Sequence, residues 1–168
     1  MKRIATVATI AVAQLVLVGV AVAPQLSARL IGDSHVLRVE PIDPIDPLRG
    51  AYVSLGYPDL QPAPDPASGE MPPGSWSLDD GESGAVYITL RREGEVWVAD
   101  EWLRERPSDT PYLACDDHSW NVRCGIESWF LPQDEALAME ADLADGAYAE
   151  VRIDRWGHAA LVDVWESP

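Results

Sequence analysis

The first 24 residues constrain this chain more than any other segment. Residues 4–23 (IATVATIAVAQLVLVGVAVA) carry no charge, and Gln14 is their only strongly polar side chain. A helix of that length is about 30 Å long, enough to cross the hydrocarbon core of a bilayer. Lys2 and Arg3 precede the run, and basic residues stay on the cytoplasmic side. We therefore expect a transmembrane helix, with the rest of the chain outside the cytoplasm.

The end of the apolar run leaves two interpretations open. Ala21-Val22-Ala23 has the A-x-A form of a signal-peptide cleavage site. However, the run exceeds the about 7–15 apolar residues usual in a signal peptide. Pro24 would also follow the cut, where its rigid ring fits an extended peptidase complex poorly. The pattern favours an uncleaved signal anchor over a cleaved signal peptide.

The remainder of the chain is strongly acidic. Without Lys2 and Arg3 it has 10 basic and 28 acidic residues, a net charge of −18. Such a surface repels the phosphates of nucleic acids, so we expect no nucleic-acid partner. We interpret the charge as a means of solubility rather than as an acidic docking face.

Most of this outer part alternates apolar and polar residues with a period of two, which predicts β-strands. Leading strands are expected in residues 34–39 and 51–57. Three hairpins are expected, formed by residues 85–90 with 95–99, 112–115 with 122–131, and 147–153 with 159–165. The apolar faces predict a core of Val53, Leu55, Val86, Ile88, Leu90, Val96, Val98, Ile126, Phe130, Leu137, Val151, Ile153, Leu161 and Val164.

Two segments break the strand pattern. The Pro- and Gly-rich residues 58–75 predict a long loop, and residues 133–143, with acidic residues in the first turn, predict a short helix. We expect a transmembrane helix in residues 1–24, a linker in 25–33 and one mainly β domain in 34–168. Its predicted fold is a compact antiparallel sandwich or half-barrel with one short helix.

The stretch PIDPIDPLRGAYVSLGY, residues 41–57, joins two Asp-Pro steps to a strand. A residue before proline avoids the helical region, and proline cannot donate to a sheet. Residues 41–48 are therefore expected to form an extended, polyproline-like edge that enters the strand at Ala51. Arg49 has five donors in a planar fork and is expected to bind Asp43, Asp46 or carbonyl oxygens.

The same stretch carries a resemblance. Residues 49–57 (RGAYVSLGY) resemble the signature of the bacterial GDYXXLXY family, with matches at Gly50, Tyr52, Leu55 and Tyr57. Residues 122–132 (VRCGIESWFLP) are similar to the second block of that family, Tyr-Gly-Ile-Glu followed by aromatics and Pro. The two blocks occur in the same order, and the resemblance covers the whole chain.

The resemblance implies an anchored extracytoplasmic domain, often encoded beside a multi-spanning membrane protein, and no established reaction. This chain departs from the family pattern at two positions. Ala51 replaces the signature Asp, and Cys124 stands where an aromatic residue is usual. If that Asp were catalytic in relatives, Ala51 would make this member inactive; otherwise the Asp is structural.

Cys115 and Cys124 are the only cysteines. Both lie outside the predicted membrane segment, where disulfides persist, and a hairpin would bring them together. The sequence favours a disulfide, which would stabilise the fold by roughly 2–3 kcal/mol in the chain-entropy model. The alternatives are a Cys–His metal site with His118 and a free redox pair.

Glu127 is the candidate catalytic residue. It lies among apolar residues in GIESWF, and desolvation by Trp or Phe raises the pKa of a carboxylate toward acid–base use. The favoured alternative is a buried ion pair with Arg49. Tyr52 and Tyr57 are interpreted either as core hydroxyls with a partner or as the lining of a binding groove.

Trp120 and Trp156 fall in predicted turns. Exposed aromatic residues at hairpin tips bind partners or enter the membrane interface, although a turn Trp also often folds back on its sheet. The three histidines have no ligand spacing, and the chain has none of the common nucleotide, hydrolase or zinc-protease motifs. We therefore expect no metal and no cofactor.

These features predict a non-enzymatic accessory module held in the bilayer by residues 4–23 and partnered with a multi-spanning membrane protein. The expected interface residues are Arg49, Tyr52, Tyr57, Trp120 and Trp156. One alternative is a cell-envelope hydrolase that uses Glu127 with Arg49 or Tyr52. The other is a small-ligand sensor with a groove beside residues 46–57. The sequence leaves the oligomeric state open.

Overall fold

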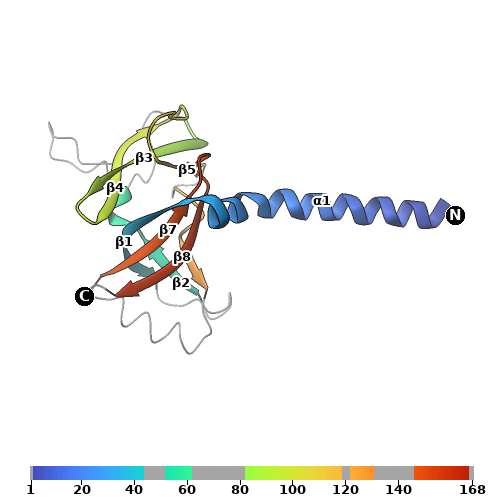
Figure 1. Cartoon of the computed structure of the whole chain (residues 1–168), viewed down its shortest axis with the longest axis horizontal. Helices are drawn as coiled ribbons and strands as arrows, with labels where there is room; N and C mark the ends of the chain where they lie inside the picture. Colours follow the sequence, from blue (N-terminus) through green and yellow to red (C-terminus); the bar gives the residue numbers. More distant parts are fainter. Residues whose placement is uncertain (1, 44–51, 62–81, 119–121, 131–145, 167–168) are drawn as a thin grey trace.

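The computed structural model describes residues 2–43, 52–61, 82–118, 122–130 and 146–166 (Figure 1). It contains the helix α1 (Lys2–Ile31), a short 3₁₀ turn η1 (Pro58–Leu60) and a set of strands. The strands are β1 (Asp33–Asp43), β2 (Tyr52–Gly56), β3 (Ala85–Glu93), β4 (Val96–Leu103), β5 (Tyr112–Asp116), β6 (Ser128–Phe130), β7 (Ala147–Ile153) and β8 (Ala159–Glu166).

The strands form two antiparallel sheets. One has five strands in the order β6-β2-β1-β7-β8 and curves into a nearly closed half-barrel. The other has three strands in the order β4-β3-β5. The prediction of a mainly β half-barrel behind one N-terminal apolar helix is confirmed.

Two of the three expected hairpins are present. The β3–β4 hairpin turns at Gly94, whose φ of 65° suits a residue without Cβ. The β7–β8 hairpin pairs residues 147–153 with 159–166, with an irregularity between Glu150 and Val151. In both, the alternating pattern and the turn residues gave the correct pairing.

The second expected hairpin is wrong. β5 pairs with β3, whereas β6 pairs with β2 in the other sheet, through Val53 opposite Trp129. Between β5 and the segment before β6 there is one isolated bridge, from Asp116 to Arg123. The chain therefore passes from one sheet to the other here, and a left-handed Gly125 (φ 82°) lies on the way. Alternation alone does not say which strand is the partner.

β1 is longer than expected. The prediction ended this strand at Val39 and placed residues 41–48 in a polyproline-like edge. In the structure Pro41 and Asp43 still pair with β2, opposite Leu55 and Ser54, with an irregularity between them. A strand tolerates proline at such an irregularity, because the missing N–H is not needed there. Residues 44–48 of the expected edge lie outside the described residues.

The predicted core is largely confirmed. Eleven of the expected residues are buried: Val53, Leu55, Val86, Ile88, Leu90, Val98, Ile126, Val151, Ile153, Leu161 and Val164. Val96 is only half-buried. Phe130 is 73% exposed, so its assignment to the core is wrong. In the short strand β6, Trp129 packs against the core, and successive side chains point to opposite faces.

Three predictions fall wholly or partly outside the described residues. The short helix expected at 133–143 and the core residue Leu137 lie outside them. So does most of the loop expected at 58–75, whose first residues form η1. The segment expected as a linker, residues 25–33, is helical up to Ile31, because α1 continues through Pro24.

Candidate functional site

α1 enters the domain at a surface with several hydrogen bonds. We call this the helix–domain joint: residues 25–31 of α1 and Gly32, with the polar groups of β7, β8 and their turn. The Ser27 hydroxyl donates to the Asp154 carboxylate at 2.6 Å, and Arg29 donates to the carbonyl oxygen of Leu161 at 2.9 Å. Arg152 of β7 donates in return to the carbonyl oxygens of Gly32 and Arg29, at 3.2 and 2.5 Å.

Close packing accompanies these hydrogen bonds. Ala28 is fully buried, and Gly32 lies against the backbone of Ile153. A Cβ at Gly32 would come within 2.9 Å of Ile153 backbone atoms and overlap the carbonyl oxygen of Ala28. Small residues at both positions let the end of the helix reach the sheet. The joint therefore fixes the C-terminal end of α1 to the half-barrel (Figure 1).

Asp154 organises the domain side of the joint. Its Oδ1 accepts the backbone N–H groups of Trp156 and His158, at 2.9 and 3.0 Å. Its Oδ2 accepts Ser27 Oγ and lies 3.0 Å from His158 Nδ1. Burial alone would raise the pKa of Asp154, but the hydrogen bonds from Ser27, His158 and Trp156 outweigh burial and lower that pKa. This carboxylate is thus held in its charged form.

A hollow of about 360 Å³ adjoins the joint. Its walls come from the end of α1, the start of β1, the segment 107–112 and the end of β7. His35 lies in one wall and is buried, with Nδ1 3.0 Å from the carbonyl oxygen of Asp33. Its ring packs edge-on against Trp97, with the two ring centroids 4.6 Å apart. The pKa of His35 is lowered by burial. The hydrogen bond to Asp33 and the charge of Asp33 raise this pKa, but burial has the larger effect. Asp33, Asp109 and Asp154 contribute acidic groups to the lining, and Arg155 contributes a basic one.

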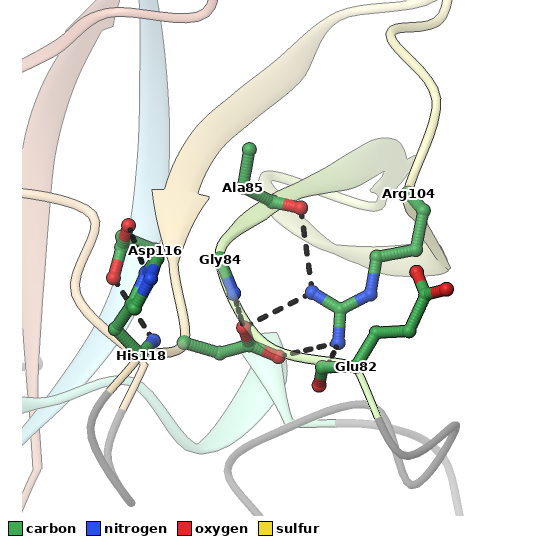
Figure 2. A network of polar contacts seen from close by, with 7 residues as sticks. Glu82, Gly84, Ala85, Arg104, Asp116 and His118 are labelled. Carbon is green, nitrogen blue, oxygen red and sulfur yellow. Dashed lines mark hydrogen bonds and ion pairs between the residues drawn. The ribbon is translucent and has the colours of Figure 1, made fainter.

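A second buried charge lies at the end of the three-stranded sheet. Arg104 holds Asp117 with two bonds, Nη1 to Oδ1 at 3.0 Å and Nη2 to Oδ2 at 2.8 Å. The Asp117 side chain is 0% exposed and also accepts the Gly84 N–H at 2.6 Å. Figure 2 shows the Arg104 guanidinium also directed at the carbonyl oxygens of Glu82 and Ala85. These partners are groups of the fold, which supports a structural role for the pair.

The structure brings Tyr57 and the Glu127 segment together. The Tyr57 hydroxyl is buried and donates to the carbonyl oxygen of Ile126 at 2.7 Å. Burial, with the nearby charge of Glu127, raises the pKa of Tyr57 far above its usual value. Tyr57 is therefore a core hydroxyl with a partner, one of the two alternatives considered for it.

Glu127 is half-buried and bonds its own turn. Its carboxylate accepts the backbone N–H groups of Cys124 and Gly125, the latter at 3.0 and 3.1 Å. Both carboxylate oxygens are thus engaged by the backbone. The expected partner Arg49 lies outside the described residues, and so does the side chain of Tyr52, although its backbone pairs with Phe130.

The cysteines form the expected disulfide between Cys115 and Cys124, with Cα atoms 4.2 Å apart. It joins β5 to the segment that crosses to the other sheet, and it removes both sulfurs from the metal-site alternative. Among the residues that the structure describes, no group of His, Cys, Asp and Glu is arranged to hold a metal ion.

Of the two turn tryptophans, Trp156 lies in the β7–β8 turn and is half-buried. The guanidinium carbon of Arg155, an exposed residue, lies 4.1 Å from the Trp156 ring centroid, a cation–π distance. Trp120 lies outside the described residues. The turn belongs to the helix–domain joint through Asp154.

Sequence reasoning missed the joint. The turn DRWGH carries a signal for its local structure, because an Asp that opens a Gly-containing turn commonly accepts backbone N–H groups. Nothing in the sequence pairs Ser27 with Asp154, which are 127 positions apart. Arg29 and Arg152 read as ordinary charged residues, and only the structure shows them bonded to carbonyl oxygens.

Comparison with known proteins gives one match. The model of the family described as GDYXXLXY protein matches residues 14–164. No curated protein and no solved structure matches the chain.

Proposed function

This chain belongs to the GDYXXLXY protein family, and from that premise we propose that it is an extracytoplasmic accessory module whose retained anchor helix docks on a multi-spanning membrane protein. Its apolar N-terminal helix and its disulfide indicate a secreted or membrane-anchored domain outside the cytoplasm. The proposal goes further in two respects, since it keeps the helix uncleaved and gives it a protein partner.

The observation that carries the proposal is the helix–domain joint. An enzyme tethered to a membrane for location alone needs only a flexible linker. Here residues 25–32 are bonded to the domain through Ser27, Arg29 and Arg152. The membrane segment and the half-barrel therefore move as one body, which suits a module that must hold a fixed orientation toward a neighbouring protein.

The exposed side of the joint fits a protein partner. Leu26, Leu30 and Ile31 lie on the docked part of α1, yet they are 51%, 68% and 65% exposed. Ile31 is eight residues beyond Ala23, or about 12 Å along the helix axis, which is beyond the hydrocarbon core if residues 4–23 span it. The outer end of another membrane protein would bury this apolar strip by packing against it.

The hydrolase alternative receives less support. It requires Glu127 to act as an acid or base, but both oxygens of that carboxylate bond backbone N–H groups of its own turn. We therefore do not assign Glu127 a catalytic role.

Site-specific photo-crosslinking in native membranes tests the proposal. A photoreactive residue is placed at Leu30 of the full-length chain, and crosslinked products are identified by mass spectrometry. The matched control carries the same residue at Glu95, in the exposed β3–β4 turn. We expect one multi-spanning membrane protein at Leu30 and none at Glu95.

A second variant tests the role of the rigid joint. A short Gly-Ser insertion between Ala23 and Pro24 leaves the anchor and the joint intact but uncouples them. We expect it to abolish the crosslink at Leu30, whereas the same insertion after Gly94 should leave it unchanged. A crosslink that survives the first insertion, or the recovery of lipid alone at Leu30, would contradict the proposal.

A further inference from the structure

We propose that the β7–β8 turn, residues 154–158, is a binding site for the headgroup of a zwitterionic phospholipid, with Arg155 on the phosphate and Trp156 in the headgroup layer. The inference rests on the retained anchor of the proposed function but not on a protein partner. It identifies a lipid ligand for the turn that carries Trp156, one of the expected interface residues.

The first step is the height of the turn above the membrane. Asp154 is bonded to Ser27, which is four residues, or about 6 Å, beyond the end of the charge-free run at Ala23. The headgroup layer on each side of the hydrocarbon core is of similar thickness, roughly 5–7 Å. Because the joint bonds the turn to α1, the turn is held within that layer if residues 4–23 span the hydrocarbon core.

The second step is the chemistry of the two side chains. Arg155 is exposed, and its guanidinium stacks on the Trp156 ring at 4.1 Å. A guanidinium that stacks through its face keeps its N–H edges available for the two oxygens of a phosphate. Tryptophan is enriched at the membrane–water interface, since its ring is apolar and its N–H is polar.

The third step is the choice of lipid. The outer part of the chain carries a net charge of −18, which repels an anionic leaflet. The hollow that Arg155 helps to line also has Asp33 and Asp109 in its walls, whereas the Asp154 side chain is 0% exposed. A zwitterionic headgroup matches both features, because its ammonium group is attracted to Asp33 and Asp109 while its phosphate meets Arg155. An anionic headgroup that has no ammonium group, such as phosphatidylglycerol, lacks the first attraction.

The test uses the full-length chain reconstituted alone in phosphatidylcholine vesicles. A fraction of the lipid carries a nitroxide on its headgroup, which quenches tryptophan fluorescence at close range. We expect quenching that is largely lost in Trp156→Phe. The matched control is Trp165→Phe near the end of β8, where the ring is also partly exposed (38%) and should contribute no quenching.

Two further experiments test the contact of Arg155 with the lipid phosphate and the effect of the net charge of the lipid. Arg155→Gln should weaken the quenching of Trp156, and replacing phosphatidylcholine with phosphatidylglycerol should weaken it for the unaltered chain. Equal quenching for the unaltered chain and Trp156→Phe, while the protein floats with the vesicles, would overturn the proposal and leave the turn as a protein-docking surface. Failure to float with the vesicles would instead overturn the retained anchor, and the lipid site with it.

Discussion

At the residue scale, two buried carboxylates show how this acidic chain uses part of its charge. Asp117 and Asp154 both follow the end of a strand and are almost fully buried. Each accepts hydrogen bonds from a side chain and from backbone N–H groups. A buried charge is tolerated only when such partners replace water. These two residues therefore act on the fold, in contrast to the acidic residues that are exposed to solvent.

Asp117→Asn should destabilise the domain strongly. The change removes the Asp117 carboxylate from the Arg104 guanidinium, whose side chain is 20% exposed. Loss of one member of a buried pair costs about 3–5 kcal/mol. Urea unfolding of the full chain in detergent micelles, followed by near-UV circular dichroism, measures the free energy of unfolding.

The control for this prediction is Arg91→Gln. Arg91 pairs with Glu93 and Asp100, but its side chain is 52% exposed. An exposed ion pair contributes about 0–1 kcal/mol. Equal losses of stability in the two variants would show that burial is not what makes the Arg104–Asp117 pair important.

His35→Phe should reduce the pH dependence of stability. Burial lowers the pKa of His35, so the folded state binds fewer protons than the unfolded state just below the unfolded pKa. Stability is then complete above about pH 6.5 and falls as the pH drops from there toward the folded pKa. Phe keeps the edge contact with Trp97 but does not titrate.

Thermal unfolding between about pH 8 and pH 5.5 measures this effect. The unaltered chain should lose stability over that range by more than His35→Phe does. The same slope in both chains would mean that His35 titrates alike in the folded and unfolded states.

At the scale of elements, the β7–β8 turn connects three parts of the molecule. It contacts α1 through Asp154, and the carbonyl oxygen of Gly157 accepts the backbone N–H of Ala114 in β5 at 2.9 Å. The Tyr112 hydroxyl also donates to the carbonyl oxygen of Arg155, at 3.3 Å. One five-residue turn thus links the helix to both sheets.

Gly157→Ala tests this connection. Gly157 has φ 81°, and a Cβ there would overlap the Tyr112 ring and lie 2.9 Å from the Ala114 nitrogen. We expect a loss of about 1–2 kcal/mol from the left-handed backbone, plus about 1–3 kcal/mol from overpacking. Gly94→Ala is the control, since its φ is 65° but no atom lies within 4 Å of a Cβ.

Urea unfolding of the two glycine variants separates the loss of stability from the left-handed backbone from the loss due to overpacking. Only the backbone contribution applies at Gly94, so the difference between the two variants measures the packing of the turn on β5. If both lose the same stability, that packing contributes nothing, and the two sheets are held together elsewhere.

At the scale of the whole molecule, α1 and the domain are expected to behave as one body. Gly32→Ala should disrupt this, because the added Cβ overlaps the Ala28 carbonyl oxygen and approaches Ile153. We expect the helix end to move away from β7 and the angle between α1 and the domain to become variable. The folded half-barrel itself should persist, since the added Cβ meets one end of β7 while the core is formed by many residues of both sheets.

Spin-label distances in lipid nanodiscs measure this angle. Labels at Val12→Cys and Glu95→Cys are specific, because both native cysteines are in the disulfide. The distance distribution should be narrow in the otherwise unaltered chain and broad with Gly32→Ala. Gly19→Ala is the control, with nothing within 4 Å of its Cβ. A narrow distribution with Gly32→Ala would contradict a joint that depends on close packing.

The sequence by itself determined the features that depend on neighbours along the chain. The charge-free run predicts α1, alternation predicts the strands, and turn residues such as Gly94 predict two hairpins. Eleven of the predicted core residues are buried for the same reason, since a period of two assigns each side chain to a face. The disulfide between Cys115 and Cys124 is also confirmed, although the hairpin expected to bring them together is replaced by one isolated bridge.

Only the tertiary structure decided which elements meet. It pairs β6 with β2 rather than with β5, exposes Phe130 and bonds Ser27 to Asp154 across 127 positions. A local pattern specifies the face of a strand but not its partner, because every exposed strand edge offers the same backbone donors and acceptors. The choice depends on how all the elements pack together, and that packing brings the end of α1 against β7 to form the helix–domain joint.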